Sequence, residues 1–282
     1  MVTRSQAFDL SYWINERYDI KCRRESGLPP PWTGDPIMAG VRWCNVHRED
    51  DAVTRWMRQS WNYQGTHPVW WWVLGRMLNY TPTLALIMSE PEDRRELTWV
   101  SSLLKDERAN GNKVFTSAYT ISTCGKSMDK IDYVMRVVKD VQAQEHPGDL
   151  MKFSTLQNTW ERLQGVDGLG SFLAAQVVAD LKNTKGHPLQ DAPDWWQWAA
   201  PGPGSLRGLS WYYRNSPEGV TPRMFKSAIE QCYSEVMPLV HERVPRISMQ
   251  DFQNCLCEFS KYMKVKHLNG HVRNKYRPGS AG

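Results

Sequence analysis

Residues 163–183 read LQGVDGLGSFLAAQVVADLKN, and this stretch decides the fold that we expect. An amphipathic helix ends before Gly165, a Gly-Leu-Gly turn follows at 168–170, and Ser171 opens a strongly apolar helix. The two glycines allow positive φ and a close approach of the backbone to another group. The amides at the start of the second helix can hold a phosphate. The pattern predicts a helix–hairpin–helix, with an ordinary helical turn as the alternative.

The remaining sequence is also predicted to be mostly helical. The expected helices are Ser5–Tyr18, from residue 49 or 50 through 56, 68–78, from residue 81 onward, 92–104, 127–141, 153–163 and from Ser248 onward. In the first of them we expect Phe8, Tyr12 and Ile14 to face inward. The Pro-rich residues 27–36 predict a loop. Residues 105–126 are rich in β-branched and aromatic side chains, which favours a strand pair or an extended segment.

The fold class predicted is therefore mainly α, with a small irregular or β patch. The chain is expected to be a single compact helical unit over 1–282, formed from two lobes of about 1–150 and about 151–282. The second lobe contains the helix–hairpin–helix and a basic C-terminal tail. Residues 261–282 carry six Lys or Arg and no Asp or Glu, which indicates a solvated tail or a contact with a polyanion.

Composition narrows the class of protein further. Hydrophobic residues make up 41% of 282, so a disordered or fibrous chain is excluded. No apolar run reaches the roughly 20 residues that cross a bilayer, and the first residues have no apolar leader, so we expect neither membrane insertion nor secretion. The six cysteines form no Cys-x-x-Cys pair, which argues against a metal site. Most of the 14 tryptophans should be core, with base stacking as the alternative for some.

Two aspartates follow the hairpin. Asp191 lies 21 residues after Gly170 (191 − 170) and Asp194 lies 24 residues after it (194 − 170). In helix–hairpin–helix DNA glycosylases a catalytic aspartate follows the hairpin glycines at a similar distance, near the pocket that receives a flipped nucleotide. The alternative is that Asp194 caps a short Trp-rich helix.

Residues 202–208, GPGSLRG, are interpreted as a second glycine-rich loop. Its amides, hydroxyl and guanidinium suit a phosphate or pyrophosphate, whereas a plain Pro/Gly turn is the alternative. It has no Gly-Lys-Ser/Thr ending, so it is not a Walker A loop.

The helix from Ser248 has a capping-box variant, with Asp251 three residues after the N-cap. Its predicted buried stripe is formed by Phe252, Leu256, Phe259 and Met263. The polar side chains Asn254 and Glu258 lie next to that stripe and face either solvent or a site. The segment VRWCNVHRED at 41–50 concentrates hydrogen-bonding groups beside an aromatic ring, which indicates a ligand site.

Taken together, five segments and the terminal NKYRPG resemble the phage alpha-glutamyl/putrescinyl thymine pyrophosphorylase family, also called amino acid:DNA transferases. The segments are PWTGDPIMAGVRWCNVHREDD, FTSAYTISTCGKSMDKI, GLGSFLAAQVVADL, DAPDWWQWAAPGPGSLRGL and QDFQNCLCEFSKY. The resemblance runs over nearly the whole chain in the same order. It implies a derivative of the helix–hairpin–helix DNA glycosylase fold that acts in thymine hypermodification. A kinase first activates 5-hydroxymethyluracil in DNA as a phosphate or pyrophosphate ester, and the transferase replaces that group with the amino group of an amino acid.

The resemblance also assigns roles to residues. Asp191 or Asp194 takes the place of the glycosylase aspartate. The other catalytic candidate is Glu258, because the attacking ammonium needs a base. Substrate and phosphate binding is expected from Arg42, Asn45, Arg48, Glu49, Gly202, Gly204, Ser205, Arg207, Asn254 and Lys261. The DNA backbone is expected to contact Gly168, Gly170 and Ser171.

The implied substrates are double-stranded DNA that carries activated, modified thymine and a free small amino acid, for which glycine is weakly favoured. No further cofactor and no metal are expected. The protein should be coupled to a 5-hydroxymethyluracil DNA kinase in the cytoplasm of a phage-infected bacterium. Ser171 and Phe172 stand where bifunctional glycosylases carry a lysine, which argues against strand cleavage through a Schiff base. A DNA glycosylase that excises a modified base and a non-catalytic DNA-binding protein remain the alternatives.

Overall fold

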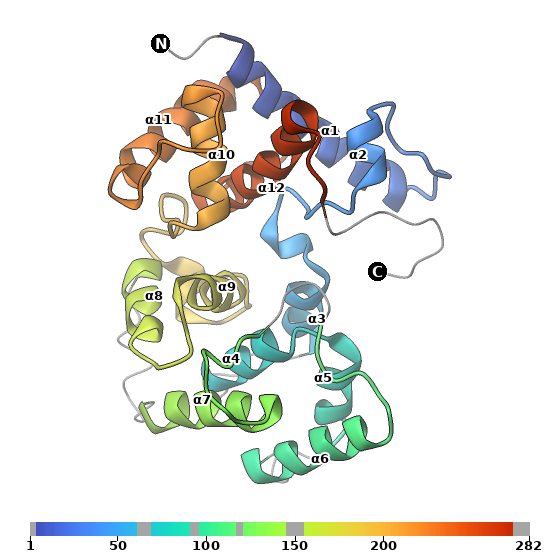
Figure 1. Ribbon diagram of the computed structural model, residues 1–282, viewed down its shortest axis with the longest axis vertical. Coiled ribbons are helices and arrows are strands. Elements are labelled where there is room, and N and C mark those ends of the chain that lie inside the picture. The colour runs from blue at the N-terminus through green and yellow to red at the C-terminus, as the bar shows by residue number, and fades with distance from the viewer. Residues whose placement is uncertain (1–3, 61–68, 91–95, 117–120, 145–154, 273–282) are drawn as a thin grey trace. The chain divides into compact units, whose positions relative to one another are not determined.

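The computed structural model describes residues 4–60, 69–90, 96–116, 121–144 and 155–272, and the regular elements in these ranges are helices (Figure 1). The predicted mainly α fold is confirmed. The expected strand pair is not found in the described part of 105–126, because helix α6, Leu97–Ala109, continues into it and irregular chain follows. Within the described ranges, no helix combines the length and the apolar character needed to cross a bilayer. Kinship with the DNA glycosylase fold stays a prediction.

The chain divides into two compact units. The terminal unit comprises residues 1–51 and 196–282, and the central unit comprises residues 52–195. This grouping differs from the lobes expected on either side of residue 150, because helices from both ends of the sequence pack together. Each unit is described separately below.

The terminal unit is built around one long helix near the C-terminus. Its elements are α1 (Arg4–Glu25), α2 (Pro36–Gly40), the 3-10 helix η1 (Arg48–Asp50), α10 (Pro203–Arg214), η5 (Pro222–Met224), α11 (Phe225–Val236), η6 (Met237–Leu239) and α12 (Met249–Leu268). Ser248 caps α12 through its side chain, and Asp251 completes the predicted capping box. The predicted stripe of Phe252, Leu256, Phe259 and Met263 is buried. Helix α12 therefore supplies the core of this unit.

Helix α1 is longer than expected, and its inward face differs from the predicted one. Ile14 is buried as expected, but Phe8 and Tyr12 are 50% and 43% exposed. The buried stripe runs instead through Leu10 and Trp13 to Arg17, on the side of the helix roughly opposite Phe8 and Tyr12.

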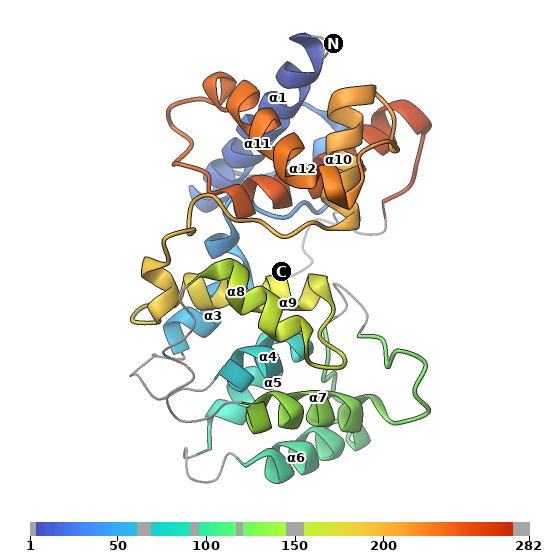
Figure 2. The ribbon, with the colours of Figure 1, turned by 90° about the vertical axis from the view of Figure 1, so that its left-hand side faces the viewer.

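Glycines bring α10 unusually close to α12, and Figures 1 and 2 show the two helices side by side. A Cβ added to Gly208 would lie 2.2 Å from the carbonyl oxygen of Leu256, and one added to Gly204 would lie 2.2 Å from the Cys257 sulfur. The interpretation of 202–208 as a glycine-rich loop is therefore wrong. The segment forms the N-cap and the first turns of α10, and its glycines occur four residues apart because two helix backbones meet there.

The central unit is a separate helical bundle, whose helices Figure 2 also shows. Its elements are α3 (Ala52–Ser60), α4 (Val69–Leu78), α5 (Thr81–Met88), α6, α7 (Lys130–Gln144), α8 (Leu156–Gln164), α9 (Ser171–Lys182) and η4 (Pro188–Asp191). The helix expected from residue 49 or 50 is split, since η1 belongs to the terminal unit and α3 begins at Ala52.

Helix α4 is buried along its whole length, including its three consecutive tryptophans. It also buries Arg76, whose Nη2 donates to Asp180 Oδ1 of α9 at 2.6 Å, while Thr54 of α3 donates to the same oxygen at 2.7 Å. A buried ion pair must be well hydrogen-bonded to offset the loss of hydration. This pair therefore sets how α3, α4 and α9 fit together.

The two helices and the glycine turn predicted at 163–183 are present as α8, a turn and α9. Gly168 has φ +105°, and a Cβ there would lie 2.6 Å from Val137 Cγ2 of α7. Gly170 has φ −68° and serves as the N-cap of α9. The expectation of positive φ is thus confirmed for Gly168 and wrong for Gly170. The close approach at Gly168 is to α7, within the protein.

We predict that Gly208→Ala lowers the free energy of unfolding by roughly 1–3 kcal/mol, because the new methyl group would overlap the α12 backbone. Urea denaturation followed by circular dichroism measures the change. Gly40→Ala is the matched control in the same unit, since a Cβ there meets no atom within 4 Å. Equal stability of the two variants would contradict the proposed helix contact.

Candidate functional site

Side chains from distant stretches of sequence, several of them predicted as site residues, meet around the middle of α12. Asn254 and Glu258 contact the segment before η1, and Gln253 and Cys257 contact the start of α10. We call this group the α12 cluster. It comprises Arg17, Cys44, Asn45, Arg48, Arg207, Asn254, Cys257, Glu258 and Lys261. All of its members belong to the terminal unit.

Polar side chains of α12 hold residues 41–47, the segment before η1, and the start of η1 in place. Asn254 Nδ2 donates to the carbonyl oxygen of Asn45 at 3.2 Å, and Asp251 Oδ1 accepts from the amide of Arg48 at 2.7 Å. The Asn45 side chain donates in turn to the carbonyl oxygen of Asp50 at 2.8 Å. The structure therefore brings the predicted residues Asn45, Arg48 and Asn254 together, although their hydrogen bonds are to the protein itself.

Glu258 is the buried carboxylate of the cluster, with 3% exposure. Its Oε2 accepts from the Cys44 amide at 3.4 Å, and its Oε1 pairs with Lys261 Nζ at 2.5 Å. Burial opposes the charge of Lys261, but the Glu258 carboxylate outweighs it and raises the pKa of the lysine. Lys261, whose side chain is 39% exposed, is therefore a cation and not a nucleophile at neutral pH.

Cys44 presents an exposed thiol beside this ion pair. The negative charge of Glu258, together with desolvation by the surrounding protein, raises the pKa of Cys44 to about 12. The thiol therefore stays protonated at neutral pH.

Arg17 of α1 also contacts the segment before η1, and the sequence analysis did not predict it as a site residue. It is 4% exposed, and its Nε donates to the carbonyl oxygen of Cys44 at 2.8 Å. It also donates to the side-chain oxygen of Asn45. Burial lowers the pKa of Arg17 to about 10, which still leaves it charged. The sequence did hold a signal, because Leu10, Trp13 and Arg17 share one helical face.

The start of α10 supplies fewer ligand groups than expected. Ser205 is fully buried, and its hydroxyl donates to the carbonyl oxygen of Gly202 at 3.0 Å while accepting from Gln253. The Gly202 amide donates back to the same hydroxyl at 3.2 Å. These groups therefore cap the N-terminus of α10 by bonding to one another, and Gly204 packs on Cys257.

Arg207 is the exposed charged residue of that segment. Burial and then Glu258 raise the pKa of Cys257, whereas the charges of Lys261 and Arg207 oppose the shift. Both cations thus lie near Cys257. The predicted residues Arg42 and Glu49 are exposed on the segment before α3.

The remaining predicted residues lie in the central unit. Asp194 accepts from the amides of Leu156 and Gln157 at 2.8 and 3.0 Å, so it caps α8 and not a Trp-rich helix of its own. Asp191 is exposed at the end of η4. The hairpin glycines and Ser171 stand at the turn into α9, with Gly170 exposed.

The α12 cluster therefore combines one buried carboxylate with two cations that reach the surface, Arg207 and Lys261, and with Arg48, whose side chain is 10% exposed and lies 3.7 Å from Asp51. Arg48, Arg207 and Lys261 provide N–H donors of the kind that bind phosphate oxygens. Glu258 holds Lys261 and the backbone of Cys44. This arrangement suits recognition of an anion, with the carboxylate fixing the geometry of the donors.

A family model described as "5-hmdU DNA kinase, helical domain" matches residues 5–271. The chain is 24% identical, over 283 aligned positions, to a 5-hmdU DNA kinase of Bacillus phage SP10. The alignment covers 89% of this chain and 44% of the relative, so the chain spans less than half of that protein. No solved structure matches significantly.

We predict that Glu258→Gln lowers the pKa of Cys44 from about 12 toward its ordinary value of 9.0, because a neutral amide no longer opposes the thiolate. Alkylation of the Cys44 peptide by iodoacetamide, measured by mass spectrometry at about pH 9, should become faster, since the thiolate is the reactive form. Cys124, exposed in the central unit, is the internal control. An unchanged Cys44 rate would contradict the assigned role of Glu258.

Proposed function

Because the chain belongs to the family of 5-hmdU DNA kinase helical domains, we propose that it binds DNA carrying 5-hydroxymethyluracil and serves phage thymine hypermodification. The observation that carries this proposal is the family match over residues 5–271, which includes the whole α12 cluster. The similar kinase is a phage protein, so the setting we propose is the infected bacterial cell.

We further propose that the chain binds the DNA, and that the nucleotide which donates a phosphate in a kinase reaction binds to another domain or partner. A phosphate-binding P-loop joins a strand to a helix, and the described ranges contain no β-strand. The tripeptide Gly125-Lys126-Ser127 has the ending of such a loop. However, Lys126 pairs with Asp167 at 2.6 Å, and α7 begins only at Lys130.

In this proposal the exposed cations of the α12 cluster contact phosphate groups. Arg207 and Lys261 reach the surface near Cys257, and Arg42 is exposed on the segment before η1. Cations that neutralise DNA phosphates release counterions, so the affinity must fall as salt rises. In the central unit, the amides at Gly170 and Ser171 are the groups we propose for a second backbone contact.

A second candidate function is the amino acid:DNA transferase that the sequence resembles. Glu258 beside a group of cations favours it, because displacement needs a base for the ammonium and donors for the leaving group. The amine nitrogen would form a bond to the methylene carbon as the carbon–oxygen bond breaks. The phosphate or pyrophosphate would leave with that oxygen, and a carboxylate would take the proton from nitrogen. Asp191, exposed and not a helix cap, is the other base we propose.

DNA binding can be tested by Arg207→Gln, which removes one exposed cation. We expect weaker binding to duplexes containing 5-hydroxymethyluracil. The slope of log K against log salt should fall in magnitude by about 0.9, the value for one lost phosphate contact. Fluorescence anisotropy over a salt series measures both quantities. Lys226→Gln on α11 is the matched control, since Lys226 is also exposed. Identical slopes of log K against log salt for both variants would show that Arg207 does not contact a DNA phosphate.

The reaction is tested by mass spectrometry of nucleosides. We expect the purified chain alone to leave 5-hydroxymethyluracil DNA unphosphorylated with ATP. If the second candidate holds, DNA carrying the phosphate ester of this base gains an amino acid and releases phosphate. Release of a free base would instead support a glycosylase. The proposal would be overturned if the chain bound modified and unmodified DNA equally well and formed no product. That result would indicate a DNA-binding protein without preference for the modified base.

A further inference from the structure

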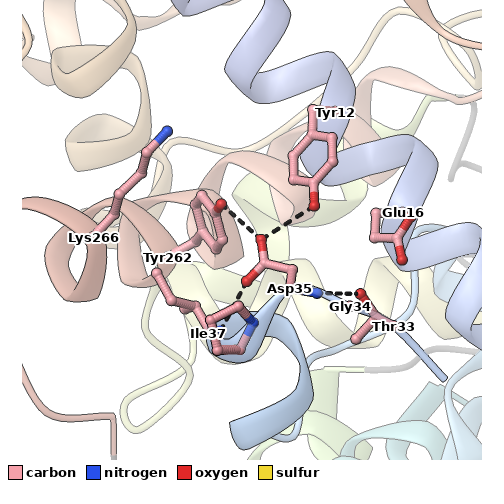
Figure 3. A pocket seen from close by; sticks show the side chains of 9 residues that line it. Tyr12, Glu16, Thr33, Gly34, Asp35, Ile37, Tyr262 and Lys266 are labelled. Atoms are coloured by element: carbon pink, nitrogen blue, oxygen red, sulfur yellow. Dashed lines mark hydrogen bonds between the residues drawn. The ribbon is translucent and has the colours of Figure 1, made fainter. Parts of the chain in front are cut away.

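The terminal unit has an open pocket of about 460 Å³ beside α12 (Figure 3). Tyr12 and Glu16 of α1 form one wall, Tyr262 and Lys266 of α12 form another, and residues 33–37 form the third. In Figure 3 the two tyrosine hydroxyls point toward the same carboxylate. None of the residues predicted as a site from the sequence lines this pocket.

Asp35 is the fixed centre of the pocket. Its Oδ1 accepts from the amides of Ile37 and Met38 at 2.8 and 3.0 Å. Its Oδ2 accepts from the hydroxyls of Tyr12 and Tyr262 at 3.2 and 2.9 Å. Four donors use the lone pairs of this carboxylate. Asp35 therefore orients the two phenols and has little remaining capacity to bind a ligand directly.

The two phenols are left as acceptors. Each gives its one proton to Asp35, so only lone pairs remain for a ligand. A hydroxyl that donates to a carboxylate is polarised and becomes a stronger acceptor. Burial and the charge of Asp35 raise the pKa of Tyr12 to about 12, so the phenol remains neutral at physiological pH. Because both hydroxyls bond to one oxygen, their acceptor sites lie close together.

The charges around the phenols favour a cation. Glu16 lines the pocket and pairs at 3.0 Å with Arg23. Lys266 lines it as well, but its ammonium pairs with Asp9 at 2.9 Å and is turned away from Asp35 in Figure 3. Lys266 Nζ already lies 5.8 Å from the centroid of the Tyr262 ring, so the exposed Tyr12 ring is the aromatic face left to attract a ligand ammonium. An anion would meet the carboxylates of Asp35 and Glu16, and the phenols have no free donor for it.

We propose that this pocket binds the primary ammonium group of a small organic amine. The phenol oxygens of Tyr12 and Tyr262 accept two of its N–H groups, and Glu16 supplies the opposing charge. This site is distinct from the α12 cluster. Tyr262 follows Glu258 by four residues on the same face of α12, a rise of about 6 Å. Amine binding would supply a reactant for the transferase reaction but does not depend on it.

The test uses the full chain and two amines, putrescine and glycine, with acetate as the anionic probe, in isothermal titration calorimetry. We expect both amines to bind and acetate not to bind. Gly34→Leu should block the pocket and weaken amine binding at least about tenfold, because Gly34 lines it and a Cβ there meets no atom within 4 Å. Gly40→Leu is the matched control with equally open space, outside the pocket lining.

A second variant tests the phenols without filling the pocket. Tyr12→Phe keeps the ring and removes one acceptor, so amine affinity should fall several-fold. Equal amine affinity in Gly34→Leu and Gly40→Leu, equal binding of acetate, or no amine binding at all would overturn the proposal. Affinity for DNA measured on Gly34→Leu should equal that of the unmodified chain. A loss of amine binding with intact DNA binding therefore separates this inference from the proposed function.

Discussion

The close contact between α10 and α12 is the constraint on which the terminal unit depends. At Gly208 the helix backbones approach so closely that a methyl group would lie 2.2 Å from the Leu256 carbonyl oxygen. That approach places Arg207 on the exposed side of α10, beside Cys257 and Lys261. The candidate anion site is thus a by-product of helix packing. The distance between its donors is set by the packing of Gly208 against the backbone of Leu256, and neither of these residues is itself a donor of the site.

Opposite charges then hold the segment before η1 against α12 and α1. Arg17 donates from one side to the backbone of Cys44, and Glu258 accepts from the same residue on the other. Each is buried, and each has a partner that limits the cost of losing hydration. A segment without regular secondary structure is consequently held by hydrogen bonds from two helices, and such support is what a preorganised binding site requires.

The sequence predicted the buried stripe of α12 and the positions of most helices, because these depend on local spacing of apolar residues, but it missed α10 and α11. It also identified Asn45, Arg48, Asn254, Glu258 and Lys261, which the structure brings together. It failed where distant packing decides the outcome. The glycines at 202–208 read as a loop because their helical partner lies about fifty residues further along the chain. The role of Asp194 was partly anticipated as a cap, but the helix it caps begins almost forty residues earlier.

The terminal unit is assembled from both ends of the sequence, and the central unit lies between them as a continuous stretch. During synthesis the ribosome therefore releases α1 long before α12 exists. The apolar face of α1, with Leu10 and Trp13, has no partner from α10 to α12 while residues 52–195 emerge. Because domains generally fold as units during synthesis, we expect the central unit to form before the terminal unit can be completed. Arg17 and Glu258, which are separated by almost the whole chain, meet only at that final step.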